Sequence, residues 1–204
     1  MQDNDQIKVW DPLVRLFHWS LVLCFFIAYV SGDEWESLHV VAGYAIAGLV
    51  AFRVVWGLIG TRHARFSDFV FTPATVLAYL KALAALRAKR YLGHNPAGGW
   101  MVVALLASLA LTSLTGMAAY GTFSIASTLL PTAVADDGHD YDEDEDEGSE
   151  LFEETHEFFA HLTLLLVTLH VAGVLISSLL HRENLVRAMI TGRKPRDRGD
   201  DHAW

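Results

Sequence analysis

Four long apolar segments dominate the pattern of hydrophobic and polar positions along the chain. They cover roughly residues 12–31, 38–59, 98–120 and 151–180, with polar stretches between them. A helix needs about 20 mostly apolar residues to cross the hydrocarbon core of a bilayer. The pattern therefore predicts an all-α integral membrane protein, built as a four-helix bundle.

A shorter apolar pattern follows the second segment. In FTPATVLAYLKALAALRAKR (71–90) a Thr-Pro pair is typical of a helix start, and apolar residues recur on one side up to Leu86. Because Lys81, Arg87 and their neighbours make it too polar to span, we expect an amphipathic helix over 72–90 on the cytoplasmic membrane surface. GHNPAGG (93–99) is then the turn into the third span.

Composition agrees with a membrane protein, and the charges predict its orientation. Hydrophobic residues make up 52% of the 204 residues, which is too many for an ordinary soluble domain. Thirteen of the 24 acidic residues fall between Asp136 and Glu157. Segments 32–37 and 121–150 contain no Lys or Arg, whereas the opposite connections and both ends contain many. The positive-inside rule therefore predicts that both termini are cytoplasmic.

Several classes of segment and site are excluded by simple features. The acidic N-terminus has no basic n-region and no small-residue cleavage site, so we expect a retained first helix and not a signal peptide. Cys24 is the only cysteine, which excludes an intrachain disulfide, thiolate-bound zinc or iron–sulfur clusters and a C-x-x-C-H haem site. We divide the chain into a membrane domain (1–194), an acidic extracytoplasmic loop within it (136–150) and a polar tail (195–204). No nucleic-acid partner is expected.

The last apolar segment carries three histidines, in THEFFAHLTLLLVTLH (155–170). His156 and His170 are separated by fourteen residues. On a helix they lie on the same face, within about 40° of each other and about 21 Å apart along the axis. His161 lies on the opposite face. The spacing places His156 near the outer membrane surface and His170 near the inner one.

Two further histidines match these depths. His18 lies near the cytoplasmic start of the first segment, level with His170, and His39 lies at the outer start of the second, level with His156. Two pairs of imidazoles from three helices suit two haem irons, each with two axial ligands. Zinc would need its ligands at one depth. The alternative is that these histidines form hydrogen bonds between helices.

Arg53 follows His39 by fourteen residues, so it shares that face about 21 Å deeper, level with His18 and His170. An arginine buried there needs an anion, and a haem propionate would supply one. The alternative is an arginine that reaches the cytoplasmic headgroups. Small residues that could leave room for a flat macrocycle, or simply help helices to pack, are Gly43, Gly57, Ala172 and Gly173.

Five motifs resemble the bacterial cytochrome b561 family. They are RLFHWSL (15–21), SLHVVAGY (37–44), FRVVWGLIGTRHARFSDF (52–69), GHNPAGG (93–99) and HEFFAHLTLLLVTLHVAGVLISSLLHRENLVRAMITGRK (156–194). That family is similar to the b-type cytochrome subunits of membrane-bound nickel–iron hydrogenases and formate dehydrogenases. The resemblance runs over about residues 7–194 and is interrupted only by the acidic loop.

The resemblance implies a bacterial inner-membrane protein with two haem b groups, in which His18 and His170 hold the inner haem and His39 and His156 the outer one. It also implies quinone chemistry at the cytoplasmic haem, for which Arg15, Asn95 and Arg53 are candidate residues. The acidic run DDGHDYDEDEDEGSE (136–150) departs from the family pattern. It is either a solvated loop or a docking surface for a basic c-type cytochrome or another periplasmic redox protein; cation binding is a weaker option.

Three functions are compatible with these features. The first is electron transfer between the quinone pool and an extracytoplasmic partner, which could be a c-type cytochrome or a dehydrogenase or hydrogenase subunit. The second is a superoxide oxidase that passes electrons from superoxide to quinone, although the acidic outer side would repel that anion. The third is a helical membrane scaffold whose histidines only join helices.

Overall fold

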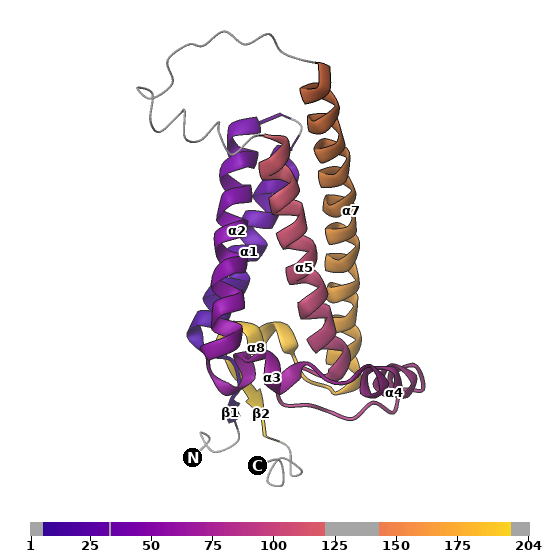
Figure 1. Cartoon of the computed structure of the whole chain (residues 1–204). Helices are drawn as coiled ribbons and strands as arrows, with labels where there is room; N and C mark the ends of the chain where they lie inside the picture. Colours follow the sequence, from indigo (N-terminus) through magenta and orange to yellow (C-terminus); the bar gives the residue numbers. More distant parts are fainter. Residues whose placement is uncertain (1–5, 33, 121–142, 197–204) are drawn as a thin grey trace.

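The computed structural model describes residues 6–32, 34–120 and 143–196. In this part of the chain, four helices are long and apolar enough to cross a membrane (Figure 1). They are α1 (Pro12–Ser31), α2 (Glu36–Ile59), α5 (Pro96–Ala119) and α7 (Glu143–Leu180). The predicted all-α four-helix membrane architecture is confirmed.

The helix starts follow local sequence signals. Asp11 precedes Pro12 and caps α1, where its carboxylate accepts a hydrogen bond from the amide of Val14 at 2.9 Å. Asn95 precedes Pro96 and caps α5, accepting from the amide of Gly98 at 2.7 Å. Proline is favoured at the first helical position because its missing N–H would be unpaired there anyway.

Close backbone contacts join α1 to α2, α2 to α5 and, most extensively, α5 to α7. Such contacts between α7 and either α1 or α2 are few at most. A buried apolar cluster lies between α1, α2 and α5; its members are Phe17, Ala28, Ala42, Ile46, Val50, Leu106 and Leu109. The α7 backbone therefore leans on α5 and stands away from the other two spans.

Both chain termini lie at one end of the bundle, which we call the terminal end; the opposite end is the distal end (Figure 1). At the terminal end β1 (Gln6–Lys8) pairs antiparallel with β2 (Arg193–Pro195), with Ile7 opposite Lys194. The elements η1 (Arg62–Ala64), α3 (Phe66–Phe69) and α8 (Leu185–Thr191) also lie there. The sequence pattern did not predict this strand pair, because three-residue strands carry no readable alternation.

The amphipathic helix α4 (Pro73–Ala84) projects sideways at the terminal end (Figure 1). It is shorter than predicted and ends before Arg90. Leu86 adopts a positive φ of 55°, while its amide donates to the carbonyl of Leu83 and the amide of Arg87 to that of Ala82. This is the hydrogen-bond pattern of a Schellman motif, which terminates a helix with a left-handed residue.

The predicted acidic loop and tail are described only in part. Residues 136–142 and 197–204 lie outside the described residues. The remaining part of the acidic run belongs to α7, which begins at Glu143 and not at 151. The prediction that the whole of 136–150 is loop is therefore wrong for 143–150, because the apolar pattern marks where a helix enters the membrane and not where its backbone hydrogen bonds start.

Candidate functional site

At the distal end, His39 of α2 faces His156 of α7. Their ring centroids are 5.9 Å apart and the ring planes make an angle of 84°. The Nδ1 atom of His39 lies 2.8 Å from the carbonyl oxygen of Ala28 in α1. The Nδ1 atom of His156 lies 2.8 Å from the carbonyl oxygen of Thr112 in α5. We call His39 and His156 the distal pair.

These two hydrogen bonds define which nitrogen of each ring carries the hydrogen. A carbonyl oxygen can only accept, so Nδ1 must donate in both rings. In the neutral rings each Nε2 then has a free lone pair and no hydrogen. The two rings therefore cannot form a hydrogen bond to each other through Nε2. A backbone carbonyl on the far nitrogen is the arrangement that orients histidine ligands of metals.

At the terminal end, His18 of α1 faces His170 of α7, with ring centroids 6.5 Å apart and an interplanar angle of 54°. We call them the terminal pair. The Nδ1 atom of His18 is buried and has no hydrogen-bond partner among the described residues. The edge of Trp19 packs against the His18 ring at 5.2 Å. The histidines that depth-matching paired thus lie together at both ends.

The separations of both pairs fit a metal ion between the rings. A metal–imidazole nitrogen bond of about 2 Å on each side, and about 1.1 Å from each nitrogen to its ring centre, place two axial ring centroids about 6 Å apart. The structure has 5.9 Å and 6.5 Å. Among the described residues no group of three or more His, Cys, Asp or Glu could hold a metal, so a carboxylate or thiolate centre has no ligand set there.

Arg53 is 2% exposed, so it does not reach the headgroups. Its Nη2 atom donates to the carbonyl oxygen of Ala64 at 3.0 Å, and its guanidinium lies 5.2 Å from the ring centre of Phe66 and 5.8 Å from that of Phe69. The Nη1 atom is buried without a hydrogen-bond partner among the described residues. A buried guanidinium with an unused donor is suited to an anion.

Three hydroxyl groups connect α5 to α7 between the two pairs. Thr163 is 0% exposed, and its hydroxyl lies 2.6 Å from that of Ser108 and 3.2 Å from that of Thr112. Thr163 also donates to the carbonyl of Phe159 in its own helix. Such hydrogen bonds between membrane helices fix their register. Because Thr112 also accepts from His156, this cluster helps to fix the distal ring.

The other histidines differ in their surroundings. His161 is exposed and its Nδ1 donates to the carbonyl of Glu157 one turn earlier, as expected for a residue off the site face. His63, His94 and His181 were expected at the cytoplasmic surface. That is wrong for His94, whose ring packs between Trp10 and Phe69 with centroids 4.7 Å and 4.5 Å away.

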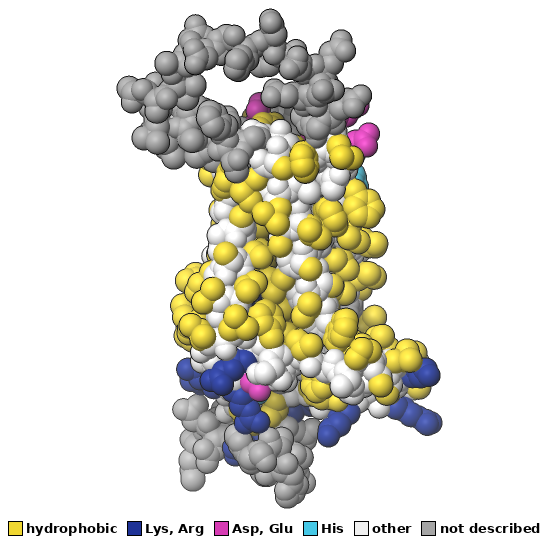
Figure 2. Space-filling view, viewed as in Figure 1, with side chains coloured by type: hydrophobic (Ala, Val, Ile, Leu, Met, Phe, Trp, Pro, Cys, Tyr) yellow, Lys and Arg dark blue, Asp and Glu magenta, His cyan; other side chains and the backbone are white. Residues whose placement is uncertain are grey.

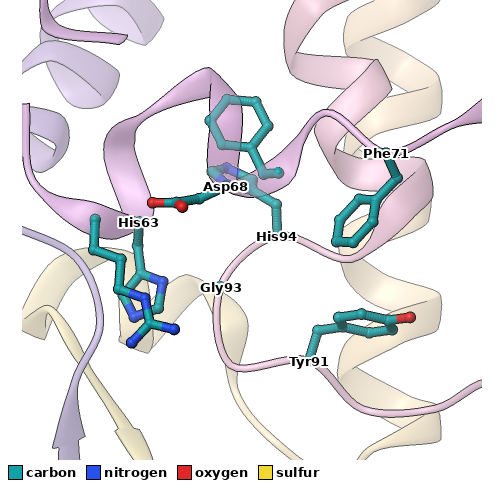
Figure 3. A pocket seen from close by; sticks show the side chains of 8 residues that line it. His63, Asp68, Phe71, Tyr91, Gly93 and His94 are labelled. Carbon is teal, nitrogen blue, oxygen red and sulfur yellow. The ribbon is translucent and has the colours of Figure 1, made fainter. Parts of the chain in front are cut away.

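A cavity of about 150 Å³ lies at the terminal end beside His94. Figure 3 shows His63 and Asp68 on one side of the segment that carries Gly93 and His94, and Phe71 and Tyr91 on the other. Burial lowers the pKa of His63, and the charge of Arg62 lowers it further while Asp68 opposes this. The cavity is distinct from the space between either histidine pair.

Comparison with known proteins agrees with this geometry. A model of the prokaryotic cytochrome b561 family matches residues 9–192. The chain belongs to this family. Membership makes it a b-type cytochrome, an electron-transport protein of the bacterial inner membrane that holds haem b. No solved structure matches the chain.

Curated relatives carry one common description. A probable Ni/Fe-hydrogenase B-type cytochrome subunit from Cupriavidus necator is 32% identical over 141 residues, which cover 55% of this chain and 58% of the relative. A protein of the same description from Rhizobium leguminosarum bv. viciae is 21% identical, with 94% of this chain and 90% of the relative covered. The chain thus spans little more than half the length of the first of these relatives.

The features on the page fit the haem b that the family implies. Four imidazoles stand in two facing pairs, the distal Nε2 atoms have free lone pairs, and Arg53 has a buried unused donor. The α7 backbone makes few close contacts with the helices that carry its partner histidines. That separation is what a flat macrocycle between the helices requires.

The small residues give a mixed result. A Cβ added at Gly43 or Gly173 would meet no atom within 4 Å, so these positions do border open space. At Gly57 it would lie 2.1 Å from the Phe66 ring. The expectation that Gly57 leaves room for a macrocycle is therefore wrong, because it leaves room for Phe66.

Gly116 is a site residue that sequence reasoning missed. A Cβ at this position would lie 2.8 Å from Cε1 and 2.9 Å from Nδ1 of His156. Gly116 lies one turn after Thr112, whose carbonyl accepts from the same ring. Depth-matching of glycines, in addition to histidines, would have found it at the level of His156.

Gly116→Ala should weaken haem binding at the distal pair by about 10–100-fold, because the methyl group displaces the His156 ring from its carbonyl partner, and loss of such orienting contacts costs metal affinity of this order. The measurement is haem retained per chain during titration with a competing apo-protein.

Gly48→Ala is the matched control, since a Cβ there meets nothing within 4 Å. It makes the same Gly-to-Ala change inside a span and should retain full haem content. Equal haem loss in both variants would mean that the Gly116 contact does not position the ring.

Proposed function

We propose that this protein carries electrons on two haem b groups, one held by the terminal pair (His18, His170) and one by the distal pair (His39, His156). The observation that carries the proposal is the distal pair's hydrogen bonding. Both Nδ1 atoms donate to backbone carbonyls, so two Nε2 lone pairs face each other with no hydrogen between them. Hydrogen bonding between helices accounts for the Nδ1 atoms but leaves these lone pairs unused.

The haems supply one-electron chemistry when bound, and the chain supplies position and electrostatics. His156 and His170 place the two sites about 21 Å apart along α7. That separation covers most of the about 30 Å hydrocarbon core. Arg53, level with the terminal pair, would hold a propionate through Nη1. Electrons would thus cross the membrane between two fixed sites.

The charge distribution supports a cytoplasmic terminal end. Figure 2 shows Lys and Arg side chains gathered there, next to a belt of hydrophobic side chains. The exposed bases in the described terminal segments are Lys8, Arg62, Arg65, Lys81, Arg87, Lys89, Arg182, Arg187, Arg193 and Arg196. The described distal segments carry no base and several exposed acids: Glu34, Glu36, Glu150, Glu153, Glu154 and Glu157. This asymmetry follows the positive-inside rule.

Quinone would exchange electrons at the terminal end, nearest the cytoplasmic haem. Two of the candidate residues for this step are engaged within the protein: Arg15 donates to the carbonyl of Ile190 at 2.6 Å, and Asn95 caps α5. Arg53 is assigned to the propionate. We therefore assign the quinone to this end of the bundle and to no single residue.

The partner outside the membrane would be a redox protein that docks at the distal end. The description of the relatives supports a hydrogenase-type partner. The exposed carboxylates support a basic docking face, such as that of a c-type cytochrome, because opposite charges steer association. The same carboxylates disfavour superoxide as the substrate, since they would repel an anion.

The test is a reduced-minus-oxidised optical spectrum of the purified protein, with haem per chain measured as the pyridine haemochrome. We expect two low-spin, six-coordinate b-type haems per chain, both reduced by a quinol. Electron transfer onward to a basic c-type cytochrome should slow as salt increases. A single haem per chain would overturn the two-site proposal, and no reduction by quinol would remove quinone from it.

A further inference from the structure

His94 is a buried titratable group that the proposed haem sites do not use. Its ring lies between Trp10 and Phe69, and its Nδ1 atom is buried without a hydrogen-bond partner among the described residues. An imidazole that only filled space between two aromatic rings would be replaced at no cost by an apolar ring. A buried, unused ring nitrogen needs another explanation.

The cavity gives this nitrogen a path to water. His94 lines it together with His63, Asp68 and Arg62, of which Arg62 and Asp68 are exposed (Figure 3). His63 is close to the His94 segment: a Cβ at Gly93 would lie 3.1 Å from the His63 Nδ1. The volume of about 150 Å³ holds several water molecules, and the polar lining offers them partners.

His94 also lies on the side of the cavity nearest the terminal haem site. The charged and titratable groups around it come from every neighbouring element. Those that act on His94 electrostatically are Arg53 of α2, His63 of η1, Lys194 of β2 and His170 of α7; the cavity adds Arg62, Asp68 of α3 and Tyr91. His94 thus stands between the water-accessible side and the terminal pair.

We propose that His94 takes up a proton when an electron arrives at the terminal pair, and that the cavity with His63 connects it to cytoplasmic water. This rests on the proposed function. In each step one electron from a quinol reaches the terminal site while one proton from water binds Nδ1 of His94. When the electron leaves for the distal site, the proton returns through the same cavity, so charge balances at every step.

The electrostatics give the direction of this coupling. Burial, reinforced by the charges of Arg53 and Lys194, lowers the pKa of His94 to about 3, so the ring is neutral before reduction. An added electron nearby is a negative charge, which favours the protonated ring and raises its pKa. Between the two pKa values the terminal haem is therefore harder to reduce as pH rises, and above the higher one the dependence ends.

The experiment is a redox titration of the terminal haem at several pH values from about 5 to 8, the range in which histidines titrate, with the protein in lipid nanodiscs. We expect the midpoint potential of the wild type to fall with pH. In His94→Phe, which keeps an aromatic ring between Trp10 and Phe69, that dependence should be lost while both haems remain bound. His181→Phe replaces another half-buried histidine of the terminal end, one that does not line the cavity, and should keep the wild-type dependence.

His94→Gln provides a second test in case Phe disturbs the haem site. A pH dependence that persists in either haem-loaded variant, or is absent from the wild type, would overturn the proposal while leaving the haem sites intact. Loss of the terminal haem from both variants would make His94 a packing residue and would overturn it as well. Absence of haem from the wild type would instead overturn the proposed function, and the optical spectrum shows this directly.

Discussion

His170→Ala should lower the haem content from two per chain to one, with the remaining haem at the distal pair. His170 and His18 approach each other across helices that make few backbone contacts, so no neighbouring imidazole can replace the lost ligand. The pyridine haemochrome gives the haem count, and the difference spectrum shows which band remains.

His156→Ala should give the opposite result, with the distal haem lost and the terminal one retained. His161→Ala is the matched control, because His161 lies on the same helix but is exposed and bonds only to the Glu157 carbonyl. It should keep both haems. Haem loss in His161→Ala would show that the wrong face of α7 has been assigned to the site.

Arg53→Met should weaken binding of the terminal haem by about 10–100-fold, the usual cost of removing a group that supports a metal ligand set. Methionine keeps a long apolar side chain against Phe66 and Phe69, so the packing at this position is largely conserved. The unused Nη1 donor and its charge are lost. Haem dissociation followed optically measures the effect, and the distal haem serves as the internal reference.

Arg65→Met is the control for loss of an arginine at the same end. Arg65 is exposed and its Nε donates to the carbonyl of Gly60 at 2.7 Å, away from the buried guanidinium site. It should leave both haems bound. If Arg53→Met retains the terminal haem as well as Arg65→Met does, Arg53 neutralises no propionate and its role is to join α2 to the Ala64 segment.

Hydrophobic pattern was sufficient for the spans because a bilayer imposes a length and a polarity on every helix that crosses it. Pro12–Ser31 agrees with the expected first span at both ends. The histidine pairs were also within reach of sequence, since a helix converts residue number into depth and facing. Pairing by depth placed His18 with His170 and His39 with His156. Their role as haem ligands stays a prediction.

Contacts between segments distant in the chain were out of reach. Gly57 and Gly116 look alike in sequence, yet one makes room for Phe66 and the other for the ring of His156. His94 is next to a turn motif typical of a surface, and it is buried only because Trp10 and Phe69 close over it. The pairing of β1 with β2 likewise joins the two ends of the chain.

The sequence by itself determined the membrane class, the four spans and the depth of each histidine, because the bilayer and the helix repeat act on each segment separately. Tertiary structure decided which nitrogens of the distal pair are used, since Ala28 and Thr112 belong to other helices. It also decided the burial of His94 and the cavity beside it. These features depend on how helices pack against one another, and no single segment carries that information.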